Sequence, residues 1–117
     1  MNLQDFIIIA KQKTYATGGS AADNLLADGS KVFVYQEDEY NYQDKYYGYN
    51  PFSGQEIVWH KNNLVWVMNY YGQVLSGEAN PKEVYSFLRS ALLEVRVVRP
   101  FRGPAEFVRG DWEYFDV

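Results

Sequence analysis

Few side chains of this chain could take part in catalysis. It has a single histidine, His60, and no cysteine, whereas acid–base and metal-assisted reactions need a group that titrates near neutral pH or a cluster of metal ligands. The acidic run Glu37-Asp38-Glu39 is typical of a solvated turn, and no HExxH, CxxC, GxSxG or phosphate-loop motif occurs. Two carboxylates could together catalyse glycosidic cleavage, and this alternative stays open, although no spacing of acidic residues in the sequence favours it. We therefore predict that the protein is not an enzyme and has no catalytic residue, metal or cofactor.

Aromatic side chains are the positive signal for function. The chain has 11 tyrosines, 7 phenylalanines and 3 tryptophans, which is more than the core of so small a domain requires. In the stretch WVMNYYGQVL, residues 66–75, Asn69, Tyr70 and Tyr71 stand directly before a glycine at the end of an expected strand. Tyrosines at strand ends can stack on flat ligands and offer hydroxyls for hydrogen bonds. We predict that these three residues line the mouth of a ligand pocket.

A second group of residues is suited to binding a small anion. Arg102 stands between Phe101 and a Gly-Pro turn, where its guanidinium could grip a phosphate in a bidentate way. The glycine-rich loop that follows residue 13 offers backbone amides, together with the side chains of Thr14, Tyr15, Thr17 and Ser20. The alternative is that each arginine is an ordinary solvated charge. A net charge of −4 argues against a nucleic acid polymer as the partner, so we expect a small anionic ligand.

The composition also bears on where the protein acts. The apolar run near the N-terminus covers only residues 6–10 and follows an acid, whereas a secretory signal or a membrane span needs a longer apolar segment. The absence of cysteine fits a reducing compartment. We expect a soluble cytoplasmic protein that does not bind membranes.

The pattern of apolar residues and turn signals predicts the elements that would hold these residues. Asn2 is the expected cap of a helix through about Lys13, and Asn80 followed by Pro81 begins a second helix near residues 81–95. Strands are expected at residues 32–36 and 39–50, and a hairpin joins residues 55–60 to 64–71. In the second of these strands, tyrosines at 40, 42 and 46 alternate with polar residues, which predicts a half-buried strand. The last segment is expected to be a loop and one short strand at 112–115. We predict one domain over residues 1–117, with an α+β fold and an antiparallel sheet.

Four segments of the chain resemble a known domain family. They are AKQKTYATGG (10–19), GQEIVWHKNNLVWVMNYYGQVL (54–75), FLRSAL (87–92) and RPFRGPAEFVRGDWEYF (99–115). The family is a bacterial domain of unassigned function that occurs alone or C-terminal to XRE-type helix-turn-helix regulators. This chain carries no helix-turn-helix and stops before the strand pair that usually follows in bacterial relatives. These departures suggest a phage or mobile-element version, which would act in the host cytoplasm.

The resemblance implies one function and leaves a second one open. A stand-alone ligand-binding domain of phage origin suggests a sponge that sequesters the cyclic nucleotide signals of anti-phage systems such as CBASS. The alternative is a sensory or protein-interaction module whose tyrosines contact another polypeptide. Because so aromatic a small domain would otherwise expose a large apolar patch, we also predict a homo-oligomer.

Overall fold

The computed structural model describes residues 1–14, 25–94 and 103–115. The chain forms two compact units: one combines Met1–Gly18 with Glu78–Val117, and the other is Gly19–Gly77. The expected single domain stays a prediction, because this division does not decide whether the units fold separately. The elements themselves make an α+β fold, as predicted.

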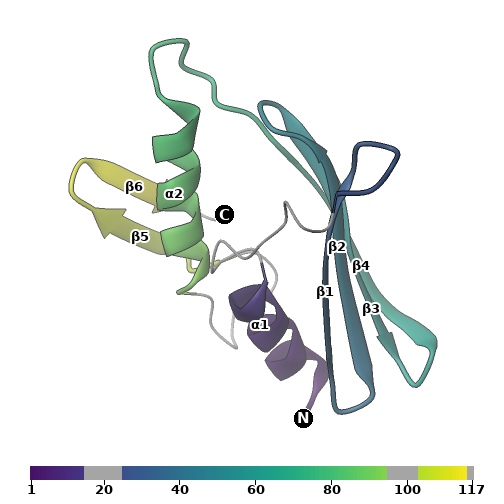
Figure 1. Ribbon diagram of the computed structural model, residues 1–117. Helices are drawn as coiled ribbons and strands as arrows, with labels where there is room; N and C mark the ends of the chain where they lie inside the picture. The colour runs from purple at the N-terminus through teal and green to yellow at the C-terminus, as the bar shows by residue number, and fades with distance from the viewer. Residues whose placement is uncertain (15–24, 95–102, 116–117) are drawn as a thin grey trace. The chain divides into compact units, whose positions relative to one another are not determined.

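The Gly19–Gly77 unit contains an antiparallel sheet of four strands (Figure 1). The strands are β1 (Lys31–Glu37), β2 (Tyr40–Gly48), β3 (Phe52–His60) and β4 (Asn63–Gly72), and they lie in the sheet in the order of the sequence. Each strand therefore pairs with the next one along the chain, which places β1 and β4 at the two edges of the described sheet. His60 ends β3 and stacks on Tyr40, its cross-strand partner, with the ring centroids 4.1 Å apart.

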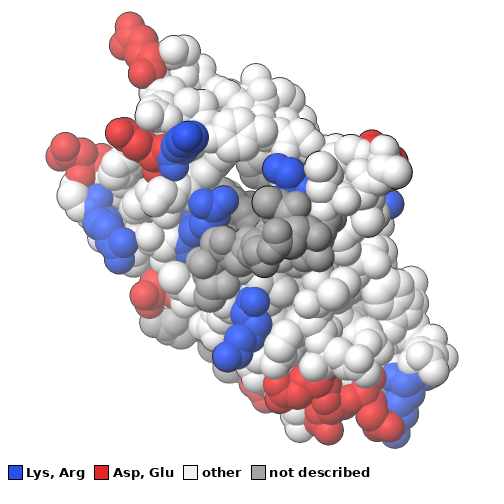
Figure 2. All heavy atoms as spheres, in the orientation of Figure 1, with Lys and Arg blue, Asp and Glu red and all other residues white. Residues whose placement is uncertain are grey.

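Short turns fix the register of this sheet. Asp38 and Glu39 connect β1 to β2, Lys61 and Asn62 connect β3 to β4, and all four have positive φ. Two consecutive residues of positive φ are the mark of a type I′ hairpin turn. The predicted hairpin is confirmed, with Asn63 already paired to His60 in β4. Lys61 also lies 3.8 Å from Glu39, and Figure 2 shows acidic side chains gathered at the end of the sheet where both turns lie.

The two faces of the sheet differ in burial, because successive side chains of a strand point to opposite sides. We call one side the buried face; it carries Phe33, Tyr42, Asp44, Glu56 and Val58, all buried. The exposed face carries Val34, Tyr47, Ser53, Val67 and Tyr71, all exposed. The predicted half-buried pattern of β2 is confirmed, because Tyr40 and Tyr42 are buried and Tyr46 is half-buried.

The other unit contains both helices. Helix α1 (Leu3–Lys13) begins where the Asn2 side chain accepts a hydrogen bond of 2.9 Å from the Asp5 amide. Helix α2 (Pro81–Leu92) begins in the same way at Asn80, which accepts one of 3.0 Å from the Lys82 amide. Both predicted caps are confirmed. Neither described helix has the length and apolar character needed to cross a membrane.

A hairpin near the C-terminus differs from the prediction. Residues predicted to form a loop and one strand form β5 (Glu106–Arg109) and β6 (Trp112–Phe115), which pair with each other. Gly110, with positive φ, and Asp111 make the turn between them. β5 escaped sequence reasoning because it is only four residues long and follows a proline closely, so its local pattern is weak. The hairpin lies beside α2 (Figure 1).

Candidate functional site

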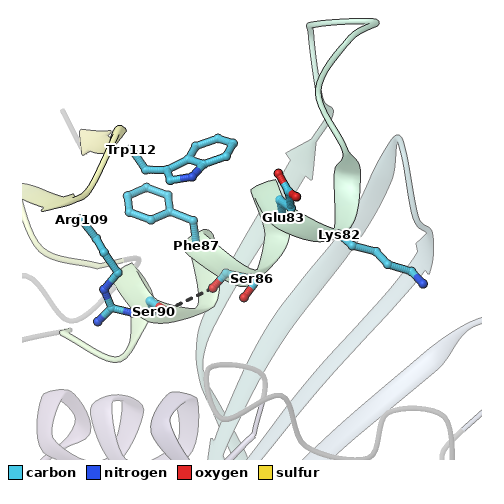
Figure 3. Close-up of a pocket in the computed structure, with 7 residues that line it drawn as sticks. All are labelled: Lys82, Glu83, Ser86, Phe87, Ser90, Arg109 and Trp112. Carbon is cyan, nitrogen blue, oxygen red and sulfur yellow. Dashed lines mark hydrogen bonds between the residues drawn. The ribbon is translucent and has the colours of Figure 1, made fainter.

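A pocket of about 370 Å³ lies between α2 and the β5–β6 hairpin (Figure 3). Every residue that lines it belongs to the C-terminal part of one compact unit. These residues are Lys82, Glu83, Ser86, Phe87, Ser90, Arg109 and Trp112. Helical spacing explains the α2 contribution, since residues three and four apart share one face of a helix. The hairpin supplies the opposite side through the cross-strand pair Arg109 and Trp112.

Aromatic rings form one wall of this pocket. Phe87 stacks with Trp112 at a centroid distance of 5.7 Å and an interplanar angle of 24°. Phe107 lies against the same Phe87 ring, also at 5.7 Å. The Trp112 side chain keeps 37% of its surface exposed, so part of it faces solvent. The wall therefore presents a partly exposed indole that stacks on Phe87, and Phe107 packs against Phe87 in turn.

An arginine forms the polar side of the pocket. The Arg109 Nη1 donates a hydrogen bond of 3.1 Å to the Ser90 hydroxyl, and its guanidinium lies 5.4 Å from the centre of the Phe107 ring. Ser90 in turn donates its hydroxyl to the Ser86 carbonyl oxygen at 3.2 Å. The contact with Ser90 uses one of the five donors of a guanidinium. Arg109 is thus oriented at two points while donors remain for a further partner.

The two charged residues of α2 that line the pocket lie away from this arginine. Figure 3 shows the Lys82 side chain extending away from Phe87 and Trp112, and Glu83 at the far end of the aromatic wall from Arg109. The lining holds one carboxylate and no histidine, and no group of three or more potential metal ligands occurs among the residues that the structure describes. A flat ring with an attached anion suits this arrangement, because an indole can stack on the ring and a guanidinium can pair with the anion.

The structure separates the three residues predicted at the pocket mouth. Asn69 and Tyr71 point to the exposed face of the sheet, whereas Tyr70 points to the buried face and donates its hydroxyl to Asp44. Neighbours along a strand always diverge in this way, so the three cannot line one pocket together. Asn69 instead accepts a hydrogen bond of 2.8 Å from Gln55, and the Tyr71 hydroxyl donates one of 3.1 Å to Gln73.

The predicted anion-binding residues have a different outcome. Thr14 is buried, and its hydroxyl donates a hydrogen bond of 2.7 Å to the Ala10 carbonyl oxygen at the end of α1. That bond uses its one donor, as is common for threonine near a helix end. The other four predicted residues, Tyr15, Thr17, Ser20 and Arg102, lie outside the described residues.

Close ring packing explains why glycines accompany these tyrosines. Gly54 pairs with Tyr70 across the strands, and a Cβ atom at Gly54 would overlap the Tyr70 ring. Gly72 pairs with Phe52 in the same way, and a Cβ there would overlap the Phe52 ring. Aromatic rings laid over cross-strand glycines are a known device of β-sheets. The glycine after Tyr71 therefore serves sheet packing.

Two carboxylates lie opposite each other on the buried face. Asp44 and Glu56 are cross-strand partners and are 4% and 3% exposed. Burial raises the pKa of the neighbouring Tyr42 well above its usual value, and the charges of Glu56 and Asp44 add to the effect. Tyr42 thus stays a neutral phenol at physiological pH. The alternating tyrosines of β2 had indicated a buried face, but nothing in the pattern indicated a carboxylate pair within it.

The pocket residues themselves escaped sequence reasoning. None of the residues that line the pocket was among the predicted site residues, and the alternative that each arginine is an ordinary solvated charge covered Arg109 as well. The available signal was the spacing of Ser86 and Ser90 around Phe87, together with an arginine set between Phe107 and Trp112. That signal becomes specific only when β5 is recognised as a strand.

Comparison with known proteins identifies the family. No curated protein and no solved structure matches the chain. The family model described as "Domain of unknown function (DUF5680)" matches residues 44–117, a segment that includes β3, β4, α2 and the whole pocket. Because this match spans more than half of the chain, the protein belongs to the DUF5680 family.

Proposed function

We propose that this protein is a non-catalytic ligand-binding protein whose pocket between α2 and the β5–β6 hairpin takes a small anionic nucleotide. The observation that carries the proposal is the Arg109 guanidinium, held by Ser90 beside the Phe87–Trp112 stack. The indole would stack on the base, and the guanidinium would pair with the phosphate.

The size and charge of the pocket support a ligand of this class. A volume of about 370 Å³ falls in the usual range for small-molecule sites. Stacking of a base on an aromatic side chain is worth about 1–3 kcal/mol, and a charge-assisted hydrogen bond about 1.5–3 kcal/mol. The net charge of −4 opposes binding of a large polyanion, so the attraction would come from the local arginine.

The more specific form of the proposal is a sponge for immune signals. In this role the protein would sequester cyclic mono- or oligonucleotides made by anti-phage systems such as CBASS and so block the defence. Support comes from the resemblance to a bacterial domain of unassigned function that also follows XRE-type helix-turn-helix segments. The signals are cytoplasmic, so the proposal includes the host cytoplasm as the site of action.

A sensory or protein-interaction module is the second candidate. It is favoured by the exposed apolar side chains Val65 and Val67 on β4, which keep 42% and 44% of their surface exposed. Apolar residues gathered on one face can mark a contact with another polypeptide. The same surface could serve the proposed homo-oligomer.

A thermal-shift panel of cyclic mono-, di- and trinucleotides tests the proposed function. A true ligand at about 100 times its dissociation constant should add ~2.7 kcal/mol of stability. The ligand should be recovered unchanged after the complex is denatured, since no reaction is proposed. A panel in which no nucleotide raises the melting temperature would argue for the interaction module instead.

Substitutions of Arg109 and Trp112 test whether the ligand binds in the pocket. Arg109→Ala should weaken binding about ten- to a hundred-fold, from the loss of a charge-assisted contact, and Trp112→Ala should weaken it by a comparable factor. Arg89→Ala is the matched control, because Arg89 lies on α2 but does not line the pocket. Equal affinities of Arg109→Ala and the wild type in calorimetric titration would remove the pocket from the proposal.

A further inference from the structure

Two exposed tyrosines on the sheet are aligned across three strands. Tyr47 of β2 pairs with Ser53 of β3, and Ser53 pairs with Tyr71 of β4. All three side chains lie on the exposed face, and Tyr47 and Tyr71 keep 48% and 65% of their surface exposed. Core packing therefore does not account for these two rings. They stand on either side of a short serine side chain.

The spacing of this row leaves room for a flat ring. Adjacent strands lie about 4.8 Å apart, so the backbones that carry the two tyrosines are roughly 10 Å apart. A planar ring between two others needs roughly 7 Å from ring to ring, twice the contact distance of about 3.5 Å. Because Ser53 is the only side chain of the row between the tyrosines, it forms a shallow floor. We call this arrangement the tyrosine slot.

The neighbouring row of side chains supplies polar groups at one end of the slot. Lys45, Gln55 and Asn69 are aligned across the same three strands, and Gln55 donates a hydrogen bond of 2.8 Å to Asn69. Two side-chain amides together offer more donors and acceptors than this one bond uses. They could therefore read the polar edge of a heterocycle that is held between the rings.

Asp28 holds one side of the slot in place. Its carboxylate accepts a hydrogen bond of 2.8 Å from the Tyr47 hydroxyl and lies 3.5 Å from the Lys45 ammonium. Lys45 also lies 6.0 Å from the centre of the Tyr47 ring. Tyr47 is thus oriented in the free protein, so less side-chain entropy is lost when a ligand binds. The Lys45 ammonium beside it, paired with Asp28 in the free protein, is the cation available to an anionic substituent.

We infer that the tyrosine slot is a second binding site, for a planar aromatic heterocycle of the nucleobase type that carries a negatively charged group. The ring inserts between Tyr47 and Tyr71 above Ser53. The amides of Gln55 and Asn69 contact its polar edge, and Lys45 pairs with the charge. Every one of these residues belongs to the Gly19–Gly77 unit, so the inference stands or fails independently of the pocket.

Titration with adenosine 5′-monophosphate tests the slot. The protein would carry Arg109→Ala and Trp112→Ala, so that the pocket does not contribute, and ¹H–¹⁵N spectra would follow the Ser53, Tyr47 and Tyr71 amides and the Gln55 side chain. We expect saturable shifts at these groups. Ribose 5-phosphate, which lacks the ring, should bind at least tenfold more weakly. Absence of shifts at the slot, or equal binding of the two probes, would overturn the inference.

Substitution of Ser53, the floor of the slot, distinguishes binding between the two tyrosines from nonspecific binding to the surface. Ser53→Phe should fill the space between the tyrosines and weaken binding of adenosine 5′-monophosphate at least tenfold, whereas Ser53→Ala should leave it within about twofold. Tyr71→Ala should weaken it roughly five- to a hundred-fold, as for the loss of one stacked ring, and Tyr71→Phe should restore it. Val34→Ala, on the same exposed face but on β1, is the control. Unchanged binding by both Ser53→Phe and Tyr71→Ala would overturn the slot.

Discussion

At the scale of single residues, Tyr70 and Tyr71 show how position decides the role of a side chain. They are identical and adjacent, yet Tyr70 donates to the buried Asp44 and Tyr71 stands mostly in solvent. A hydrogen bond to a charged group within the protein is worth about 1.5–3 kcal/mol, whereas an exposed one contributes little because water can replace it. The two phenols should therefore differ in their contribution to stability.

We predict that Tyr70→Phe lowers the free energy of unfolding by about 1.5–3 kcal/mol, because it removes a hydrogen bond donated to the buried carboxylate of Asp44. Tyr71→Phe should lower it by less than about 0.5 kcal/mol, as is usual at the surface. Urea denaturation of the two variants and the wild type measures both values. A loss from Tyr71→Phe as large as that from Tyr70→Phe would contradict the assignment of the two faces.

Asp28 should contribute to the pH dependence of stability. Hydrogen bonds from the Ser30 hydroxyl and amide, and then from the Tyr47 hydroxyl, hold the pKa of Asp28 well below its usual range. A carboxyl with a lowered pKa in the folded state stabilises the protein above its unfolded pKa of about 3.9 and loses this effect as the pH falls. We predict that the melting temperatures of the wild type and Asp28→Asn differ at pH 6 and converge towards pH 2. A difference that is constant over this range would show that Asp28 does not titrate in this way.

At the scale of elements, the sheet depends on glycines that make room for rings. Gly72 lies under the Phe52 ring, so a methyl group there forces one of the strands or the ring to move. Gly103 is buried in a similar way, with the Tyr114 hydroxyl oxygen 2.7 Å from where its Cβ would lie. These contacts join residues of different strands or loops. These glycines are therefore required by the packing between elements, and the local conformation of the backbone is not the reason for them.

Gly72→Ala should destabilise the protein by about 1–3 kcal/mol, the usual cost of inserting a group into a well-packed site. Gly77→Ala is the matched control: nothing lies within 4 Å of its Cβ position, so the change should be neutral or slightly stabilising. Thermal unfolding measures both variants. In a Phe52→Ala background, Gly72→Ala should destabilise the protein less than it does in the wild type. An equal loss of stability in both backgrounds would exclude the Phe52 ring as the cause.

At the scale of the whole molecule, β4 favours association. It is an edge strand of the described sheet, and none of its ten residues, Asn63–Gly72, carries a charge. Edge strands of natural proteins are commonly protected by charged residues or proline. The opposite edge differs, because β1 begins with Lys31, ends with Glu37 and is bridged by Leu25 at its start.

We predict that the protein is a homo-oligomer with β4 at the contact, most simply a dimer of twice the 13.6 kDa chain mass. Val67→Lys should shift it to the monomer, since a charge on an edge strand opposes pairing. Val34→Lys places the same charge on the same face of β1 and should leave the mass unchanged. Light scattering at micromolar concentration tests both, and a monomeric wild type would exclude the prediction.

Local interactions made several features predictable from the sequence alone: the caps at Asn2 and Asn80, the Lys61-Asn62 turn, and the alternation of β2. Each depends on residues within a few positions of one another, so their types suffice to specify the backbone. The tertiary structure alone decided which tyrosine faces Asp44, and it alone brought Arg109 to Ser90, 19 residues earlier in the chain. Such contacts depend on strand register and on the pairing of β5 with β6, which no local preference determines.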